Sequence, residues 1–97
     1  MAVYVDNARV PWRGRHWCHL VADSLEELHA FARVLGLRRA WFQARASLPH
    51  YDVTVETRMV ALSHGAHIVD RRTLVSVGRQ LKQELADQAE RQLRLFD

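Results

Sequence analysis

Cysteine, proline, glycine and lysine are scarce in this 97-residue chain, and long apolar runs are missing. The single cysteine, Cys18, cannot form a disulfide bond within the chain, which agrees with a reducing compartment. No apolar run reaches the roughly 20 residues that a membrane-spanning helix needs, and the first residues are not a basic segment followed by an apolar one. We therefore expect a cytoplasmic protein without membrane association.

Apolar residues at helical spacing predict three helices, over residues 24–35, residues 53–63 and from residue 73 onward. Ser24 is a typical N-cap for the first helix, and Gly36 supplies the left-handed conformation that ends it. Asp52 is a suitable N-cap for the second helix. The last helix has an apolar stripe: Leu74, Val77, Leu81, Leu85 and Ala89.

Short apolar runs predict strands at residues 2–6, 40–42 and 66–70. Pro11 and Gly14 indicate an exposed loop that leads into a short strand near residues 18–21. Because helices separate most of these strands, we expect an α/β fold with a small, mostly parallel sheet of three to four strands flanked by helices. Residues 1–91 are predicted to form this single domain, and residues 92–97 a C-terminal peptide.

Several blocks of the chain resemble, in order, the bacterial and phage family known as domain of unknown function 4031. The blocks are VYVD, WRGRHWCHLVAD, ELHAFARVLGLRRAWFQ and PHYDV, so the resemblance covers about residues 3–68. The family's name implies no activity. The resemblance does imply that seven residues with reactive or aromatic side chains lie in the family's recurrent blocks: Trp17, Cys18, His19, His29, His50, Tyr51 and Asp52.

The last six residues, QLRLFD, are similar to the bacterial sliding-clamp-binding peptide, which runs Gln, Leu, a small or acidic residue, Leu, Phe. The similarity implies that Leu95 and Phe96 enter an apolar cleft on the clamp and that Leu93 packs beside them. Gln92 would form a hydrogen bond at the edge of the cleft. Arg94 departs from the usual middle residue. The alternative is that the three apolar residues finish the last helix and pack on the sheet.

The basic residues are concentrated in the first half of the chain. Residues 1–50 hold seven arginines and four acids, whereas residues 51–97 hold seven of each sign, and thirteen of the 14 basic residues are arginine. Arginine suits bidentate contacts to phosphate or carboxylate, although codon usage in a GC-rich genome explains the same bias.

One arginine-rich segment also contains tryptophan. Trp12, Arg13, Arg15 and Trp17 lie in a stretch without any acid between Asp6 and Asp23. Arginine can hold a phosphate while tryptophan stacks on an unpaired base, so we expect Trp12, Arg13 and Arg15, together with Tyr51, to contact nucleic acid or phosphate. The alternative is that the tryptophans are buried and the arginines are solvated.

Histidine and carboxylate side chains form a second candidate site. If the sheet is parallel, the loop that holds His50 and Asp52 lies at the same edge as Asp6 and Asp70. Together with His19, these two residues have the side chains needed for general acid and base catalysis, and Tyr51 could orient a substrate oxygen. The alternative is that Asp52 caps a helix and His50 bonds to the backbone.

Two metal sites are open on sequence grounds. Acids at strand ends are typical of Mg²⁺-dependent nucleases, which gives a divalent-metal site at Asp6, Asp52 and Asp70, although such acids also cap helices. Zinc could bind at His-x-x-His pairs, of which there are two: His16 with His19, and His64 with His67.

These observations favour a small DNA-associated protein that docks to the sliding clamp through its C-terminal peptide. The alternative is an enzyme or binding protein for a nucleotide or small phosphorylated ligand, with His19, His50 and Asp52 in its site. Whether the protein is catalytic, and its oligomeric state, are left open.

Overall fold

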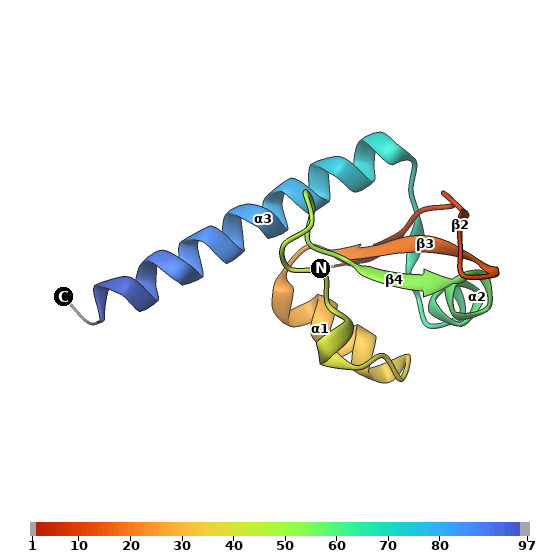
Figure 1. Ribbon diagram of the computed structural model, residues 1–97, viewed down its shortest axis with the longest axis horizontal. Coiled ribbons are helices and arrows are strands. Elements are labelled where there is room, and N and C mark those ends of the chain that lie inside the picture. The colour runs from red at the N-terminus through yellow and green to blue at the C-terminus, as the bar shows by residue number, and fades with distance from the viewer. Residues whose placement is uncertain (1, 96–97) are drawn as a thin grey trace.

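The computed structural model describes residues 2–95, which form a twisted sheet with helices on both sides (Figure 1). The strands are β1 (Val3–Val5), β2 (Val10–Trp12), β3 (Arg15–Ala22), β4 (Tyr51–Thr54) and β5 (His67–Ile68). The helices are α1 (Leu25–Val34), α2 (Val55–Ser63) and α3 (Arg71–Arg94), with a 3₁₀ turn, η1 (Arg39–Trp41), after α1. None of the helices within residues 2–95 is long and apolar enough to span a membrane.

The sheet is organised around β3, the longest strand. β1 and β2 pair antiparallel along one edge of β3, and β4 pairs antiparallel along the other. β5 joins the outer edge of β1 and is parallel to it. The small α/β fold is therefore confirmed, but the expected mostly parallel sheet of three to four strands is wrong, because the sheet is mixed and has five strands.

A β-hairpin replaces the expected loop and accounts for most of the difference. Arg13 and Gly14 form a two-residue turn with φ of 50° and 74°, and Trp12 pairs with Arg15 across it. Two positive φ angles are typical of the type I′ turn, whose twist matches that of the flanking strands. Pro11 is tolerated because β2 lies at the edge of the sheet.

An irregular segment interrupts the pairing between the first two strands and β3. Val5 pairs with Leu20 and Val10 with Trp17, so the four residues 6–9 face only the two residues 18–19. Arg9 takes up part of the excess with a φ of 51°. Bulges of this kind bend a strand and redirect its side chains, and here the bulge places Asp6 beside β3.

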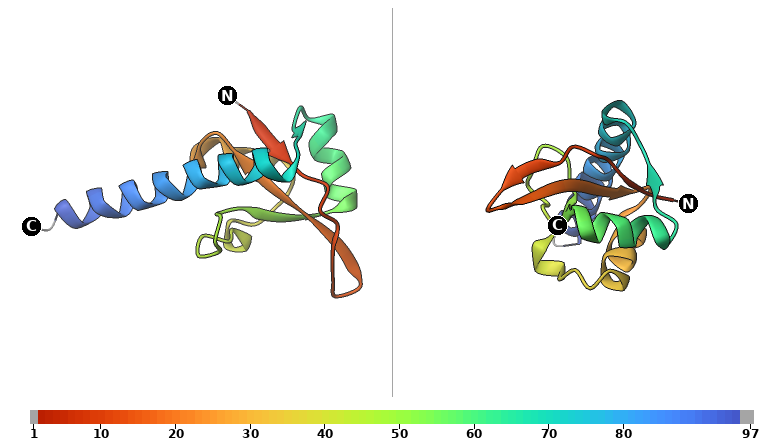
Figure 2. Two further views of the ribbon diagram at one scale, coloured as in Figure 1. Left: turned by 90° about the horizontal axis from the view of Figure 1, so that it is seen from above. Right: turned by 90° about the vertical axis from the view of Figure 1, so that its right-hand side faces the viewer.

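The alternation of side chains along β3 divides the molecule in two. Cys18, Leu20 and Ala22 are buried on one face, and Tyr51 of β4, the partner of Leu20, contacts α1 from this face. His19 and Val21 point to the opposite face, where α3 begins. Figure 2 shows α3 on one side of the sheet and α1 and α2 on the other.

Local patterns explain the ends of the first two helices. The Ser24 hydroxyl accepts a hydrogen bond from the Glu27 N–H at the start of α1, and Gly36 has a φ of 80° after its end, as expected. Asp52 does not cap α2. It lies inside β4, and the Thr54 side chain caps the helix instead. The predicted strand at residues 40–42 is also wrong, because this segment contains η1 and is largely exposed.

α3 packs on the body of the protein only through its first half. Leu74, Val77 and Leu81 are buried, whereas residues 86–95 are all exposed and the helix projects away from the sheet (Figure 1). The helix continues through Arg94, so the predicted boundary between residues 91 and 92 falls within it.

Gly78 of α3 fixes the position of the loop that precedes β4. A Cβ atom on Gly78 would lie 3.0 Å from Cβ of Leu48, so glycine allows the loop to cross the helix at close range. A bridge between Gln43 and His50 also joins the two ends of the loop. Leu48 and His50 are therefore held on both sides.

Candidate functional site

A cleft of about 700 Å³ opens on the α3 side of the sheet. Its walls come from the bulged segment after β1, from β3, from the loop before β4 and from the first turns of α3. The ionisable side chains in these walls are Asp6, His19, His50, Asp70 and Arg71. The cleft therefore combines segments that are far apart in the sequence.

Asp6 holds His19 by two hydrogen bonds. One carboxylate oxygen, Oδ1, accepts from the backbone N–H of His19 at 2.7 Å, and the other, Oδ2, lies 2.8 Å from the ring Nδ1. Asp6 is itself anchored, because its backbone oxygen accepts a 2.7 Å hydrogen bond from Nε of the buried Arg58. Since a carboxylate accepts, Nδ1 of His19 donates to Asp6, and Nε2 is the ring nitrogen left for other contacts.

The charge of Asp6 is preserved although its side chain is largely buried. Burial acts to raise the pKa of Asp6, but the hydrogen bonds from the His19 ring and backbone outweigh it, so the pKa lies below the ordinary value. Asp6 therefore remains a carboxylate at neutral pH and keeps the imidazole oriented.

His50 is fixed by oxygen atoms at both ring nitrogens. Nδ1 donates to the backbone oxygen of Leu48 at 2.7 Å, and Nε2 lies 3.0 Å from Oδ1 of Asp52. An imidazolium ion satisfies both oxygens at once, since it carries a hydrogen on each nitrogen. Burial lowers the pKa of His50, but the bonds to Asp52 and Leu48 outweigh that effect and raise it above its usual value. The hydrogen bond from His50 lowers the pKa of Asp52.

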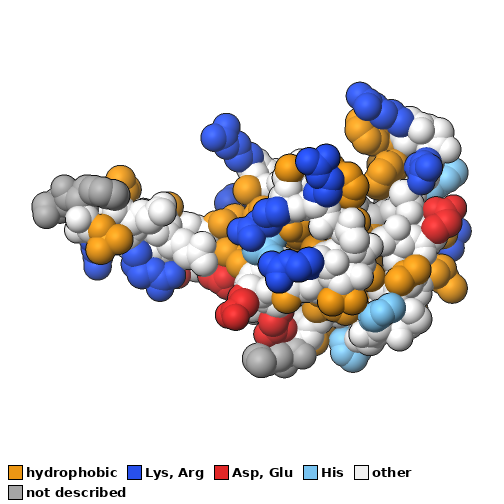
Figure 3. All heavy atoms as spheres, turned by 90° about the horizontal axis from the view of Figure 1, so that it is seen from below, with side chains coloured by type: hydrophobic (Ala, Val, Ile, Leu, Met, Phe, Trp, Pro, Cys, Tyr) orange, Lys and Arg blue, Asp and Glu red, His pale blue; other side chains and the backbone are white. Residues whose placement is uncertain are grey.

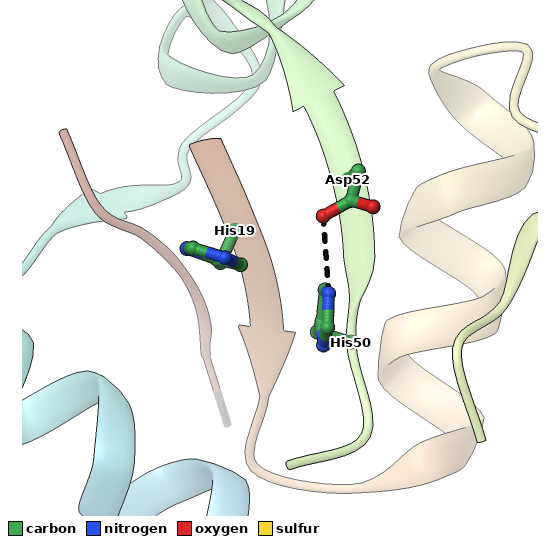
Figure 4. A group of neighbouring side chains, drawn as sticks. All are labelled: His19, His50 and Asp52. Atoms are coloured by element: carbon green, nitrogen blue, oxygen red, sulfur yellow. Dashed lines mark hydrogen bonds and ion pairs between the residues drawn. The ribbon is translucent and has the colours of Figure 1, made fainter. Parts of the chain in front are cut away.

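The two pairs meet on one face of the sheet. His19 and Asp52 are directly opposite each other on β3 and β4, and His50 lies two residues before Asp52, so all three side chains point the same way (Figure 4). The rings of His19 and His50 have centroids 5.0 Å apart. One potential ligand atom from each of the three residues lies within 4.8 Å of the other two.

Chemically, this arrangement places two imidazole rings side by side, each held by its own carboxylate. Such a pair can donate a proton at one nitrogen and accept one at the other, which is the requirement for general acid and base catalysis. The predicted acid–base residues His19, His50 and Asp52 are thus brought together by the structure.

Tyr51 is not part of this group. Its ring is 1% exposed on the opposite face of the sheet, and its hydroxyl lies 2.8 Å from Nδ1 of His29 on α1. Phe42 packs against both rings. The predicted phosphate-binding role of Tyr51 has no support in this position, because the side chain faces the core.

The predicted nucleic-acid residues lie at the tip of the β2–β3 hairpin, away from the cleft. Arg13 and Arg15 are exposed, and the Arg13 guanidinium carbon lies 4.5 Å from the ring centroid of Trp12, which is 58% exposed. Trp17 is half-buried and donates from its indole nitrogen to the backbone oxygen of Trp12. The alternative of two buried tryptophans is therefore wrong for Trp12.

The three strand-end aspartates do not form one cluster. Asp70 is exposed and caps α3 by accepting a 2.8 Å hydrogen bond from the Thr73 N–H. Asp6 and Asp52 are paired with different histidines. Within residues 2–95, the group of potential metal ligands that comes together is instead the one at His19, His50 and Asp52.

The structure describes the predicted docking residues up to Leu95. Gln92, Leu93 and Leu95 are exposed, the two leucines by 70% and 79%, so the alternative in which these leucines pack on the sheet is wrong. Phe96 lies outside the described residues.

A second basic surface was missed by the sequence analysis. Arg33, Arg38 and Arg39 are exposed around the end of α1, and Arg33 and Arg39 border a shallow hollow beside His29. Figure 3 shows basic side chains gathered on the face seen from below. Burial and the charges of Arg39 and Arg33 lower the pKa of His29. The arginine excess of residues 1–50 therefore divides between this surface and the hairpin.

Replacing Asp52 with asparagine is expected to lower the free energy of unfolding by less than about 1 kcal/mol, because Asp52 is 39% exposed and solvent screens its pairing with His50. Because the folded state raises the pKa of His50, the stability that His50 gains from this pair is fully present below the ordinary value of 6.5. It is lost as the pH rises through the folded pKa. Because the folded state lowers the pKa of Asp52, the stability that Asp52 gains from the pair is fully present above its ordinary pKa of 3.8. The fall in unfolding free energy caused by D52N should thus be largest between pH 3.8 and pH 6.5.

Urea unfolding of the wild-type protein and of D52N, each in the presence of chelator at pH 5.5 and at pH 8.5, measures this difference in unfolding free energy. The exposed Asp87, whose carboxylate accepts from Gln83, provides the control variant D87N, for which the difference should not change between the two pH values. A D52N loss that is equal at both values, or larger at pH 8.5, would contradict the paired arrangement.

Comparison with known proteins identifies a family. The model of the family described as "Protein of unknown function (DUF4031)" matches residues 3–81, so the match continues beyond residue 68, where the resemblance was expected to end. The matched region contains all five strands and ends before the projecting half of α3. It includes the four site residues Asp6, His19, His50 and Asp52. No curated protein and no solved structure matches the chain. The chain belongs to the DUF4031 family.

Proposed function

We propose that this protein acts at DNA, where its C-terminal segment docks to the bacterial sliding clamp and its β2–β3 hairpin contacts nucleic acid. The observation that carries the proposal is the exposure of Leu93 and Leu95 at the end of a helix that leaves the body of the protein. Docking peptides bind through a few apolar anchors that are free beforehand, and two exposed leucines two residues apart at the end of a projecting helix can supply such anchors.

The helical state of the segment is compatible with docking. Residues 92–94 belong to the last turn of α3, and that turn is not covered by the rest of the protein. If the cleft on the clamp takes the segment in an extended form, only this turn has to unwind. Terminal turns without tertiary packing open at small cost, so the helix is no barrier to binding.

The hairpin supplies the second contact. Trp12 offers an exposed ring, Arg13 stacks on it, and Arg15 extends from the next strand, so a base and its phosphates would meet aromatic and basic groups together. A contact of this size is weak alone. Tethering to the clamp would raise its effective concentration near DNA and allow a weak contact to act.

Removal of the anchors tests the docking. Replacing Leu95 and Phe96 with alanine, or deleting residues 92–97, should abolish binding to purified bacterial sliding clamp in surface plasmon resonance. The melting temperature should change by less than about 1 °C, because Leu95 makes little contact with the body of the protein.

The matched control for docking is Arg94→Ser. This change places a small residue, which the docking peptide usually has, at the middle position, and it removes only an exposed ion pair with Glu90. Clamp binding and the melting temperature should therefore both persist. The proposal is wrong if the wild-type protein does not bind the clamp, or if the alanine variant binds equally well. A fall of several degrees in the melting temperature would show that the segment belongs to the core.

A second candidate function is favoured by the cleft. It brings His19 and His50 together near the exposed Arg71, which suits a nucleotide or small phosphorylated ligand. In this function the two histidines and Asp52 would act as general acids and bases, and the β2–β3 hairpin would not contribute to binding.

Binding of a fluorescent single-stranded oligonucleotide separates the two candidates. Replacing Arg13 and Arg15 with glutamine should weaken binding several-fold and reduce its dependence on salt, because two phosphate contacts are lost. The control replaces Arg79 and Arg91, two exposed arginines of α3, in the same way and should have little effect. An equal loss of oligonucleotide affinity in the Arg13/Arg15 variant and in the Arg79/Arg91 control would contradict a contact by the hairpin. Thermal stabilisation by a mononucleotide that survives in the hairpin variant would favour the cleft.

A further inference from the structure

We infer that His19, His50 and Asp52 form a binding site for a divalent transition-metal ion, and that Zn²⁺ is the ion whose ligand preference they match best. The site differs in membership from both metal sites considered from the sequence. It is independent of clamp docking, because its residues lie on the sheet and the docking segment lies at the end of α3.

The three residues already lie at nearly the spacing that a metal requires. One ligand atom from each lies within 4.8 Å of the others, and Nε2 of His50 is 3.0 Å from Asp52. Ligand atoms around a tetrahedral Zn²⁺ with bonds near 2.1 Å are about 3.4 Å apart. The widest pair therefore has to close by at most about 1.4 Å, which small torsional changes of the partly exposed Asp52 and His19 side chains can provide while His19 stays bonded to Asp6.

The surroundings of the two histidines favour a metal over a chance cluster. Nδ1 of His19 donates to Asp6, and Nδ1 of His50 donates to the backbone oxygen of Leu48. Nε2 of His50 lies 3.0 Å from Asp52, and Nε2 of His19 is the nitrogen that Asp6 does not engage. Histidines that bind metals typically donate their other nitrogen to a carboxylate or backbone carbonyl in this way, which fixes the ring and makes Nε2 a better ligand.

Binding replaces one existing interaction. The hydrogen that Nε2 of His50 shares with Asp52 has to leave before both atoms can coordinate an ion. The positive ion then takes over the role of that hydrogen, since it contacts the same nitrogen and the same carboxylate. The charges of Asp52 and the nearby Asp6 balance those of the ion.

The cleft gives the ion an open coordination position. His19 and His50 both line it, so water or an oxygen atom of a ligand can reach a metal held between them. Three protein ligands and one exchangeable position are typical of catalytic zinc sites, whereas structural sites are closed by four protein ligands. The expected occupant of the fourth position is thus water or an anionic oxygen such as that of phosphate.

Zinc titration of the wild-type protein, stripped of metal by chelator, tests the site at pH 7.5. Isothermal titration calorimetry should give one equivalent of Zn²⁺, and NMR should show the ring resonances of His19 and His50 shifting first. His16, His64 and His67, which are exposed, are internal controls. Shifts led by those three residues, or the absence of stoichiometric binding, would overturn the inference.

Variants assign the ligands. His19→Ala, His50→Ala and Asp52→Asn should each weaken Zn²⁺ binding by at least tenfold, whereas the control His16→Ala should leave it unchanged. Asp6→Asn should weaken binding by roughly 10- to 100-fold through the orientation of His19, without removing a ligand. Circular dichroism checks that each variant is folded, and His19→Gln replaces His19→Ala if the latter is not.

Cobalt gives a readout that is separate from affinity. One equivalent of Co²⁺ should produce the visible absorption of a low-coordinate site in the wild-type protein and lose intensity in Asp52→Asn. A spectrum like that of hydrated Co²⁺, or one that is identical in wild type and Asp52→Asn, would overturn the assignment of these ligands.

Discussion

Pairing of β3 along both of its edges is the constraint on which the rest of the structure depends. An antiparallel ladder places directly opposed residues on one face, so the register of β3 with β4 sets His19 beside Asp52 and Leu20 beside Tyr51. Because side chains alternate, a shift of one residue would exchange the core with the cleft. The burial of Cys18 and Leu20 therefore also fixes where His19 points.

This constraint explains why polar groups collect beside a strand that is otherwise buried. The bulge after β1 adds two residues to the edge of β3 and brings the Asp6 carboxylate to both the backbone and the ring of His19. On the other edge, the loop that crosses Gly78 brings His50 into line with Asp52. Each histidine thus has its own carboxylate, and both histidines line the same cleft.

The sequence predicts the helices better than the sheet, for physical reasons. Ser24, Gly36 and the first part of the apolar stripe of α3 are local features and are present as expected, although the stripe ends before the exposed Ala89. The hairpin is not visible in this way, because its turn requires Arg13 to adopt a positive φ that arginine rarely takes. The strand expected around Trp41 fails because apolar content alone does not supply an edge with which to pair.

The candidate site could be predicted only in part. His50 and Asp52 are two residues apart, and a strand places such residues on one face, so their proximity follows from the sequence. His19 was grouped with them on the expectation of a parallel sheet, and the antiparallel register brings it there instead. The role of Asp6 depends on the bulge and had no sequence signal. Tyr51 shows the opposite error, since its neighbours in sequence face the cleft and it faces the core.

Asp6 orients His19 so that Nε2 is the ring nitrogen available to the group formed with His50 and Asp52, and the site depends on this orientation. The most direct test is long-range ¹H–¹⁵N NMR of the metal-free protein at pH 8, where an ordinary imidazole is neutral. The account predicts that His19 carries its hydrogen on Nδ1 and a lone pair on Nε2. A spectrum with the hydrogen on Nε2, or with both tautomers equally populated, would contradict it.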